Sequence, residues 1–160
     1  MIMAAASAAP TGESGPWHAA FPAPKTTEPG AVSREEMLEL VKSGTAGKDY
    51  VLVDLRRNDY EGGTIKTSIN LPAQSLYPNI PTLHTVFAAA GVKQVIWYCG
   101  SSTGRGTRAA GWFQDHIDSQ GGEQMRSVIL KGGIKGWVAG GTEFTEEMDG
   151  FDEGAWNKPA

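Results

Sequence analysis

Short continuous runs of apolar residues alternate along this chain with longer stretches in which apolar residues recur at helical spacing. The runs at 50–55, 94–98 and 127–130 are rich in β-branched and aromatic residues, and the mixed segment Ser68-Ile69-Asn70-Leu71-Pro72 can be a short strand that Pro72 ends. Unbroken apolar runs of this length are typical of strands buried on both faces, as they are in a parallel sheet. Each run is therefore predicted to be a strand of such a sheet.

The stretches between these runs predict helices. Ser33-Arg34-Glu35-Glu36 is a capping box, and the apolar stripe that follows it ends near Gly44. Further helices are predicted over 79–90, 106–118 and 134–139. Pro81 suits the first turn of one of them, and Gly91 suits its C-cap. Strands that alternate with helices in this way predict an α/β fold with a central, mostly parallel sheet flanked by helices.

The two ends of the chain differ from this pattern. Residues 1–30 are rich in Ala, Pro, Gly, Ser and Thr, which predicts a flexible N-terminal tail whose first dozen or so residues are disordered. Trp17 and Phe21 are the large apolar residues of this tail, and we expect them to lie across the domain. The domain is predicted to span 31–142. Residues 143–160 are predicted to form a C-terminal tail that packs an apolar edge on it, through Phe144, Met148, Phe151 and Trp156.

Composition narrows the classes of partner. The chain has 14 basic and 18 acidic side chains, which argues against a nucleic-acid partner. No apolar run reaches the roughly 18–20 residues that span a bilayer, and the N-terminus lacks the pattern of a secretory signal or transit peptide. One cysteine excludes an intramolecular disulfide, and His18, His84 and His116 lack metal-ligand spacing, so no metal and no bound cofactor are predicted. We expect a reducing compartment, the cytoplasm or also the nucleus. The sequence predicts no oligomeric state.

The one cysteine stands where a predicted strand meets a predicted helix. Cys99 follows the run at 94–98, and Arg105 comes just before the helix predicted to begin at residue 106. Small residues let backbone N–H groups point inward around an anion, and an arginine can bind two oxygens of phosphate, arsenate or sulfate. We therefore predict a small oxyanion or a phosphorylated compound as the substrate. Its binding residues would be Gly100, Ser101, Ser102, Thr103, Gly104 and Gly106.

Cys99 would act as a nucleophile only as a thiolate, and a free cysteine thiol titrates near pH ~8.5. The predicted helix brings its positive end and its unpaired N–H groups to the loop, and Arg105 adds a full positive charge. Both stabilise a thiolate. The sequence thus predicts Cys99 as the nucleophile and Arg105 as the residue that binds the oxyanion.

Two other interpretations fit this segment less well. A lone cysteine at a strand end is often just a small buried apolar residue, but the order of Gly, Ser and Arg after Cys99 favours a site. The run from Gly104 to Ala109 also fits the dinucleotide fingerprint G-x-G-x-x-A. That fingerprint normally opens the first βα unit and is followed by an acid at a strand end, whereas the strand at 127–130 is followed by Lys131. No G-K-[ST] sequence occurs, which excludes a P-loop.

Three segments resemble the rhodanese superfamily. The segment from Asp54 to Pro72 is similar to its D-x-R…G-H-I…S-I-N-L-P signature, and Leu130 to Trp137 is similar to its closing L-x-G-G-…-W element. Together with the Cys99-x5-Arg105 loop, the resemblance covers roughly residues 33–140. It implies a rhodanese-like three-layer α/β domain with the cysteine loop at the C-terminal edge of the sheet.

Loop length divides the chemistries of this superfamily. Sulfurtransferase loops are one residue shorter between the cysteine and the basic residue. The longer Cys99-x5-Arg105 loop is similar to that of the cell-division-cycle dual-specificity phosphatases and the fungal arsenate reductases. The resemblance implies that Cys99 is the nucleophile on a phosphate- or arsenate-like substrate and that Arg105 binds the oxyanion. Gly106 matches the glycine that follows the arginine there.

The chain departs from the family pattern at four positions. Tyr98 replaces the histidine before the cysteine, and Thr64 replaces the histidine of G-H-I. Gly100 and Gly104 stand where the phosphatases carry acidic residues. A phosphatase needs a general acid for the leaving alkoxide, and this loop has none. The nearest acids in the matched segments would serve only if the fold brings one close: Asp54, Asp59 or Glu61.

Arsenate reduction asks less of the protein, because an external thiol such as glutathione, with glutaredoxin, can resolve a Cys99–arsenate adduct. With a single cysteine, that resolution must be external. Three functions stay open: phosphatase or arsenate reductase chemistry, sulfur transfer through a Cys99 persulfide, and a non-catalytic module that binds an anion or a partner.

Other residues are expected to support the site. Asp54, Arg56 and Tyr98 are predicted to be supporting residues, with Asp54 and Arg56 as a structural ion pair or hydrogen-bond network beneath the loop. Arg108 lies one turn past the loop, where it either adds positive potential or is solvated. The core or the pocket wall is expected to contain Trp97, Trp112 and Trp137.

Overall fold

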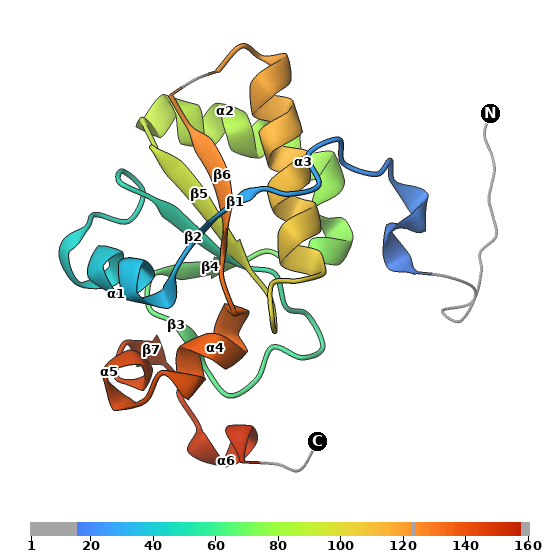
Figure 1. The fold of residues 1–160 in the computed structure, drawn as a ribbon. Coiled ribbons are helices and arrows are strands. Elements are labelled where there is room, and N and C mark those ends of the chain that lie inside the picture. The colour runs from blue at the N-terminus through green and yellow to red at the C-terminus, as the bar shows by residue number, and fades with distance from the viewer. Residues whose placement is uncertain (1–15, 123, 158–160) are drawn as a thin grey trace.

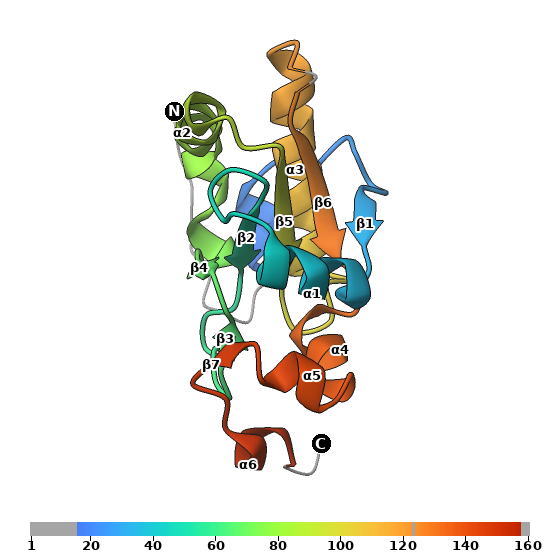
Figure 2. The ribbon, with the colours of Figure 1, turned by 90° about the vertical axis from the view of Figure 1, so that its left-hand side faces the viewer.

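Five parallel strands form the centre of the computed structural model, which describes residues 16–122 and 124–157. Their order across the sheet is β1-β6-β5-β2-β4, and Figure 2 looks onto the sheet with the strands in that sequence. Neighbouring strands all pair in parallel. Their bounds are Gly30–Val32 (β1), Val51–Asp54 (β2), Ser68–Asn70 (β4), Gln94–Tyr98 (β5) and Arg126–Leu130 (β6).

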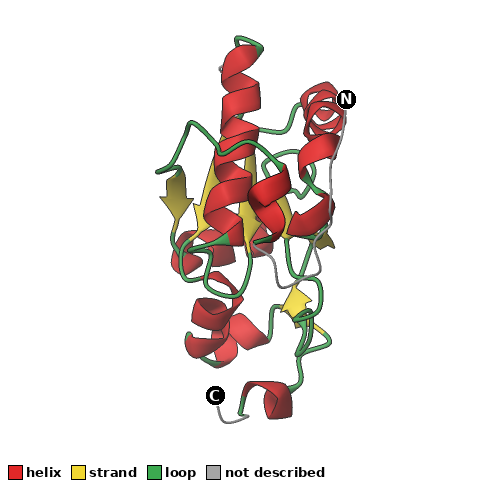
Figure 3. Cartoon of the chain, turned by 90° about the vertical axis from the view of Figure 1, so that its right-hand side faces the viewer, coloured by secondary structure: helices red, strands yellow, loops and turns green. Residues whose placement is uncertain are grey.

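Helices cover both faces of this sheet (Figures 1 and 3). Successive side chains of a strand point to opposite faces. Val53 and Trp97 therefore pack with α2 (Ile80–Ala90) and α3 (Arg105–Ser119), while Leu52 and Ile96 pack with α1 (Arg34–Ser43). The two resulting apolar clusters are the core of the protein. The predicted three-layer α/β fold with a parallel sheet is confirmed.

The sequence signals for helix ends are also confirmed. Ser33 and Glu36 exchange the two hydrogen bonds of a capping box at the start of α1. Gly91 ends α2 in the left-handed region, with φ 78°. Two short 3-10 helices precede α2, η2 (Ala73–Ser75) and η3 (Tyr77–Asn79). Helix α3 begins at Arg105, one residue earlier than predicted, so the arginine belongs to the first turn of the helix.

Three short strands were not predicted. Strand β1 pairs Gly30 with Val128, and β3 (Thr64–Ile65) pairs antiparallel with β7 (Met148–Asp149). Segments of two or three residues show no hydrophobic period, so only the pairing with a distant strand defines them. The β3–β7 pair joins the C-terminal segment to the turn after β2.

The C-terminal segment consists of α4 (Gly133–Ala139), α5 (Thr142–Thr145), β7 and α6 (Glu153–Trp156). Phe144 and Met148 are buried, and Phe151 and Trp156 pack against the same apolar cluster. The Trp156 indole N–H donates a hydrogen bond of 2.9 Å to the carbonyl of Gly62. The apolar side chains of this segment thus lie against the domain.

Residues 16–29 pack across α3, whereas the sequence indicated a flexible tail through residue 30. This segment, which we call the strap, includes the 3-10 helix η1 (Trp17–Ala20). Trp17 and Phe21 each meet Trp112 of α3 edge to face, with ring centroids 6.1 and 5.9 Å apart. The predicted disorder of the first dozen residues falls outside the described residues. No helix within the described ranges is long and apolar enough to cross a membrane.

Candidate active site

Cys99 lies at the carboxyl edge of the sheet, immediately after β5, and is only 3% exposed. Its sulfur accepts hydrogen bonds from two backbone N–H groups of the loop, Ser102 at 3.2 Å and Gly106 at 3.4 Å. Gly106 is in the first turn of α3, so the positive end of that helix points at the sulfur. The loop therefore curls around Cys99 as the sequence indicated.

The Gly132-Gly133 turn holds the start of the loop. The N–H groups of Ile134 and Lys135 donate to the carbonyls of Cys99 and Gly100, each at 3.0 Å. Gly133 has a φ of 61°, and a Cβ there would lie 2.6 Å from the carbonyl oxygen of Cys99. Only glycine fits this close approach. The closing G-G motif thus positions the cysteine loop through α4.

Ser102 is the most constrained residue of the loop. It is fully buried with a φ of 67°, and its hydroxyl has no hydrogen-bond partner among the described residues. Its carbonyl accepts a 2.8 Å bond from the Thr107 hydroxyl. A Cβ at Gly106 would lie 3.1 Å from Cβ of Ser102, so this glycine allows the tight turn. The outer part of the loop is more open, and the Ser101 and Thr103 hydroxyls are 2.8 Å apart there.

Arg105 is paired with Asp59, which comes from the turn after β2. Two hydrogen bonds join the guanidinium to the two carboxylate oxygens, at 2.9 and 2.6 Å. The hydrogen bonds from Arg105 lower the pKa of Asp59 to about 2, although partial burial opposes the change. They also raise the pKa of Arg105, against the opposing effect of burial, and the nearby Cys99 adds to the rise. Both groups are therefore ionised at neutral pH.

Asp54 and Arg56 form the structural ion pair expected of them. The Arg56 guanidinium donates to the Asp54 carboxylate at 2.7 and 3.0 Å, with the two residues 0% and 1% exposed. Burial opposes the charge of Arg56, but the hydrogen bonds and charge of Asp54 outweigh it and raise its pKa. Arg56 also donates to the carbonyls of Glu61 and Gly63, at 3.0 and 2.8 Å. The pair thus fixes the turn that carries Asp59 to the site.

Tyr98 and Thr64, which replace the two family histidines, contact each other. Their hydroxyls are 2.8 Å apart, and Thr64 also donates to Asp54 at 2.8 Å. The Tyr98 hydroxyl is 2.7 Å from the Ser68 hydroxyl. Burial, followed by the charge of Asp54, raises the pKa of Tyr98, so this phenol is neutral. Tyr98 belongs to the apolar cluster on the α1 face, opposite α3, and leaves the site unobstructed.

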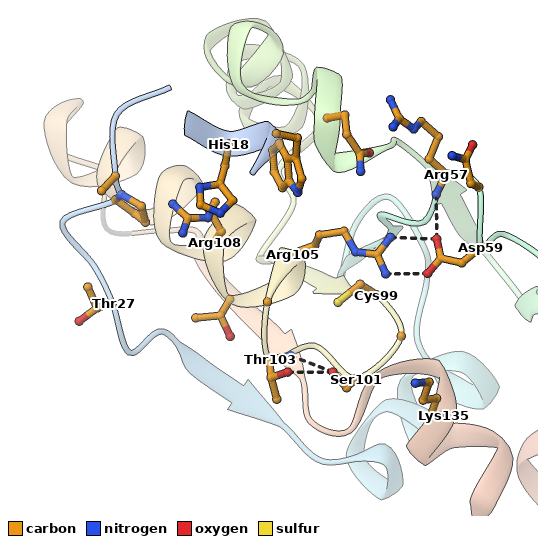
Figure 4. Close-up of a pocket in the computed structure, with 18 of the residues that line it drawn as sticks. His18, Thr27, Arg57, Asp59, Cys99, Ser101, Thr103, Arg105, Arg108 and Lys135 are labelled. Atoms are coloured by element: carbon orange, nitrogen blue, oxygen red, sulfur yellow. Dashed lines mark hydrogen bonds and ion pairs between the residues drawn. The ribbon is translucent and has the colours of Figure 1, made fainter. Parts of the chain in front are cut away.

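A cavity of about 850 Å³ opens over the cysteine loop (Figure 4). Among the described residues that line it, Asp59 is the one carboxylate, against the positive charges of Arg57, Arg105, Arg108 and Lys135. No group of three or more His, Cys, Asp or Glu within the described ranges is arranged to hold a metal ion. Trp97 and Trp137 are core residues, and Trp112 supports the strap.

The structure gathers the predicted loop residues around Cys99 and also adds residues that the sequence interpretation missed. Lys135 lies in the quoted G-G element, and its charge was the available signal. Arg57 follows the quoted D-x-R motif directly. Trp17 and Phe21 were expected to lie across the domain, but nothing in the sequence placed the strap at this cavity, since that position depends on contacts with α3. Of the proposed acids only Asp59 lines this cavity; Asp54 is buried beneath it, and Glu61 borders a smaller neighbouring pocket.

Comparison with known proteins agrees with this fold. Arsenical-resistance protein 2 of Saccharomyces cerevisiae is 29% identical over 97 residues, which are 56% of this chain and 75% of that protein. The structure of the As-Sb reductase from Leishmania major has a TM-score of 0.58 at 22% identity, covering 66% of this chain and 74% of that one. Yeast Ygr203w, described as a protein tyrosine phosphatase of the rhodanese family, has a TM-score of 0.66 at 24% identity, covering 79% and 96%.

The sequence profile of the rhodanese-like domain matches residues 34–140, from the start of α1 to the end of α4. This range holds the sheet strands β2, β4, β5 and β6, the cysteine loop and the Gly132-Gly133 turn. Since the match covers more than half of the chain, this protein belongs to the rhodanese-like domain family.

Proposed function

We propose that this protein is a cysteine-dependent enzyme acting on tetrahedral oxyanions, and that its reaction is the reduction of arsenate. The observation that carries the proposal is the position of the Cys99 sulfur. It lies 3.2 and 3.4 Å from two backbone N–H groups, on the wall of a cavity that also holds Arg105. Backbone donors and a helix N-terminus stabilise both a thiolate and a bound anion.

In the first step, the Cys99 thiolate attacks the arsenic of bound arsenate. A sulfur–arsenic bond forms, and a hydroxyl oxygen of the bound arsenate leaves as water after taking a second proton from solvent. Arg105 and the amides of the loop bind the remaining oxygens. A backbone that needs no reorganisation to meet the developing charge is an effective electrostatic catalyst.

In the second step, an external thiolate attacks the sulfur of the Cys99–arsenate adduct. A disulfide between Cys99 and that thiol forms, and the electron pair of the breaking sulfur–arsenic bond remains on arsenic. Arsenic(V) is thereby reduced to arsenite, and the two sulfurs are oxidised. A further thiol, free or on a glutaredoxin, then reduces the disulfide, because Cys99 has no partner cysteine in the chain.

The Asp59–Arg105 pair favours arsenate over phosphate esters. An alkoxide leaving group needs a proton from a general acid, whereas the leaving oxygen of arsenate already carries one proton as a hydroxyl and takes its second from solvent. Asp59 is the carboxylate that lines the cavity, and its pKa of about 2 keeps it ionised. It therefore has no proton to give at neutral pH. The similarity to Arsenical-resistance protein 2 supports the same choice.

Purified wild type, Cys99→Ser and Arg105→Gln proteins test the proposal. We expect arsenite to form from arsenate in the presence of glutathione and glutaredoxin. Cys99→Ser should abolish this turnover, and Arg105→Gln should lower kcat/KM by roughly 100-fold, as for other oxyanion-binding groups. Thiosulfate-to-cyanide sulfur transfer that exceeds arsenate reduction would favour the Cys99 persulfide instead. Turnover that survives Cys99→Ser would exclude both reactions, and the lack of any turnover would favour a binding module.

A further inference from the structure

The strap, residues 16–29, is fastened to α3 by specific polar contacts. The carboxylate of Asp115 accepts hydrogen bonds from the N–H of Lys25 at 2.7 Å and from the N–H and hydroxyl of Thr26 at 3.0 and 2.7 Å. The Trp112 indole donates to the carbonyl of Pro22 at 2.8 Å. A Cβ at Gly111 would collide with the Thr26 carbonyl, so the helix surface is shaped for this close approach.

The strap forms a wall of the cavity that contains Cys99. Figure 4 shows His18 and Thr27 of the strap on the opposite side of Arg105 from Asp59. Pockets of about 300–1,000 Å³ hold drug-sized ligands, so a cavity of about 850 Å³ has room for much more than one oxyanion. The family match begins at residue 34, beyond the strap. The strap side is lined by Trp17, His18, Ala23, Pro24, Thr26 and Thr27.

This side of the cavity also carries a cation, the guanidinium of Arg108. Arg108 lines the cavity one turn beyond Arg105, with Cζ 5.9 Å from the ring centroid of Trp112. Within the described part of the chain, no carboxylate lies within ion-pair distance of Arg108. A partly enclosed guanidinium is a good partner for a ligand carboxylate, which it can bind with two parallel hydrogen bonds.

We propose that the strap side of this cavity binds the reducing thiol, and that the class it takes is a low-molecular-weight thiol carrying carboxylates. The inference rests on the proposed function, because a chain with one cysteine must admit a second thiol beside the arsenate adduct. Arg108 binds a carboxylate of that thiol. Trp17, His18 and Pro24 cover the rest of the molecule and bring its sulfur to the adduct on Cys99.

The chemistry is that of the second step above. The incoming thiolate forms a bond to the Cys99 sulfur, the sulfur–arsenic bond breaks, and its electron pair reduces arsenic(V) to arsenic(III). The strap adds no group to this exchange. It selects which thiol enters and holds it in place.

A comparison of two thiols distinguishes an effect on thiol binding from an effect on the reaction itself. Arsenate reduction is measured with glutathione, which carries two carboxylates, and with 2-mercaptoethanol, which carries none. The proteins are wild type, Arg108→Gln, and Asp115→Ala, which releases the strap. The matched controls are Arg126→Gln, on β6, and Asp118→Ala, which lies on α3 but makes its hydrogen bond to Gln114. Thermal melts and circular dichroism confirm that each variant is folded.

We expect the ratio of kcat/KM for glutathione to kcat/KM for 2-mercaptoethanol to fall at least about fivefold in Arg108→Gln and about threefold in Asp115→Ala. Both controls should keep the wild-type ratio. Binding of S-methylglutathione, which cannot react, should weaken in parallel. An unchanged ratio in folded Arg108→Gln, or no binding of S-methylglutathione by wild type, overturns the inference while leaving arsenate reduction by 2-mercaptoethanol intact. If neither glutathione nor 2-mercaptoethanol supports arsenate reduction, the proposed function and this inference are overturned together.

Discussion

Arg105 and Asp59 are 46 residues apart in the sequence, yet two hydrogen bonds of 2.9 and 2.6 Å join their side chains over the cysteine loop. The arginine expected to bind the substrate oxyanion is thus already bound to an anion of the protein itself. The side chains of Arg105 and Asp59 are 23% and 51% exposed, so a ligand can reach both. An incoming oxyanion must share this guanidinium with Asp59 or displace it.

Asp59→Asn should therefore strengthen oxyanion binding. Two like charges about 4 Å apart repel by about 4 kcal/mol at an effective dielectric constant of 20, and solvent exposure of Asp59 reduces that severalfold. We expect a gain of about 1 kcal/mol, a roughly fivefold lower dissociation constant for inorganic phosphate or KM for arsenate. Asp118→Asn makes the same charge change at the far end of α3 and should have no such effect. Weaker binding by Asp59→Asn would mean that Asp59 instead orients Arg105.

The same pair should contribute to stability in a defined pH window. Asp59 has a pKa of about 2 in the folded protein and an ordinary value of about 3.9 when unfolded. A lowered folded pKa gives stability that is present above about pH 4 and lost as the pH falls towards 2. Because Asp59 is half exposed, the effect should be at most about 1 kcal/mol, or about 2–4 °C in Tm. The Tm difference between wild type and Asp59→Asn should shrink from pH 7 to pH 2. A constant difference would contradict this assignment.

Phosphate esters should be hydrolysed only when the leaving group needs no proton. A general acid contributes about 10²–10⁴-fold, and the ionised Asp59 supplies none. We expect p-nitrophenyl phosphate to react at least about 100-fold faster than phenyl phosphate, whose leaving group is much more basic. Gly104 offers a way to introduce an acid, since a Cβ there meets no atom within 4 Å and its φ is −111°.

Gly104→Glu should reduce the difference between the hydrolysis rates of p-nitrophenyl phosphate and phenyl phosphate. Gly104→Gln, which has the same shape without a transferable proton, should leave it unchanged. Equal narrowing by both variants would show that the side chain acts by packing rather than by proton transfer.

Local signals predicted the fold and the place of the Cys99 loop within it. The β5 run and the α3 helix are each encoded in contiguous residues, so the loop between them was placed correctly before any contact was known. Contacts over long sequence separations were not predictable. Asp59 reaches Arg105, and Lys25 and Thr26 reach Asp115, only because strands and helices bring distant segments together. Tails of low hydrophobicity give no periodic signal, and the strap was therefore assigned to a flexible region, although Trp17 and Phe21 were expected to lie across the domain as they do.

The sequence also presented Tyr98 and Thr64 as two separate departures from the family pattern. In the structure they form one cluster with Ser68 and Asp54, on the face of the sheet away from α3. Neither side chain lines the cavity over Cys99. Because their hydroxyls are hydrogen-bonded to each other, we expect the two substitutions to compensate each other, which a single sequence does not reveal.

A double-mutant cycle measures this compensation. Tyr98→Phe removes an acceptor for the N–H of Ile65 as well as the contact to Thr64, and Thr64→Val removes a donor to Asp54. Each should lower the free energy of unfolding by about 1–3 kcal/mol, since buried polar groups lose their partners. The decrease in the free energy of unfolding of the double variant should be smaller than the sum of the two single decreases, by about 0.5–1.5 kcal/mol, because the two hydroxyls share one hydrogen bond.

Urea denaturation of the four proteins gives the coupling energy, and Ser127→Ala provides the control. Ser127 has a buried hydroxyl that donates to the Ala110 carbonyl of α3, and it shares no hydrogen bond with Tyr98. The decrease in the free energy of unfolding caused by Ser127→Ala should therefore add to the decrease caused by Tyr98→Phe. Arsenate turnover should change less than twofold in Tyr98→Phe if that variant stays folded, because the phenol acts beneath the sheet edge and not in the cavity. Full additivity of Tyr98→Phe and Thr64→Val would show that the two substitutions are independent after all.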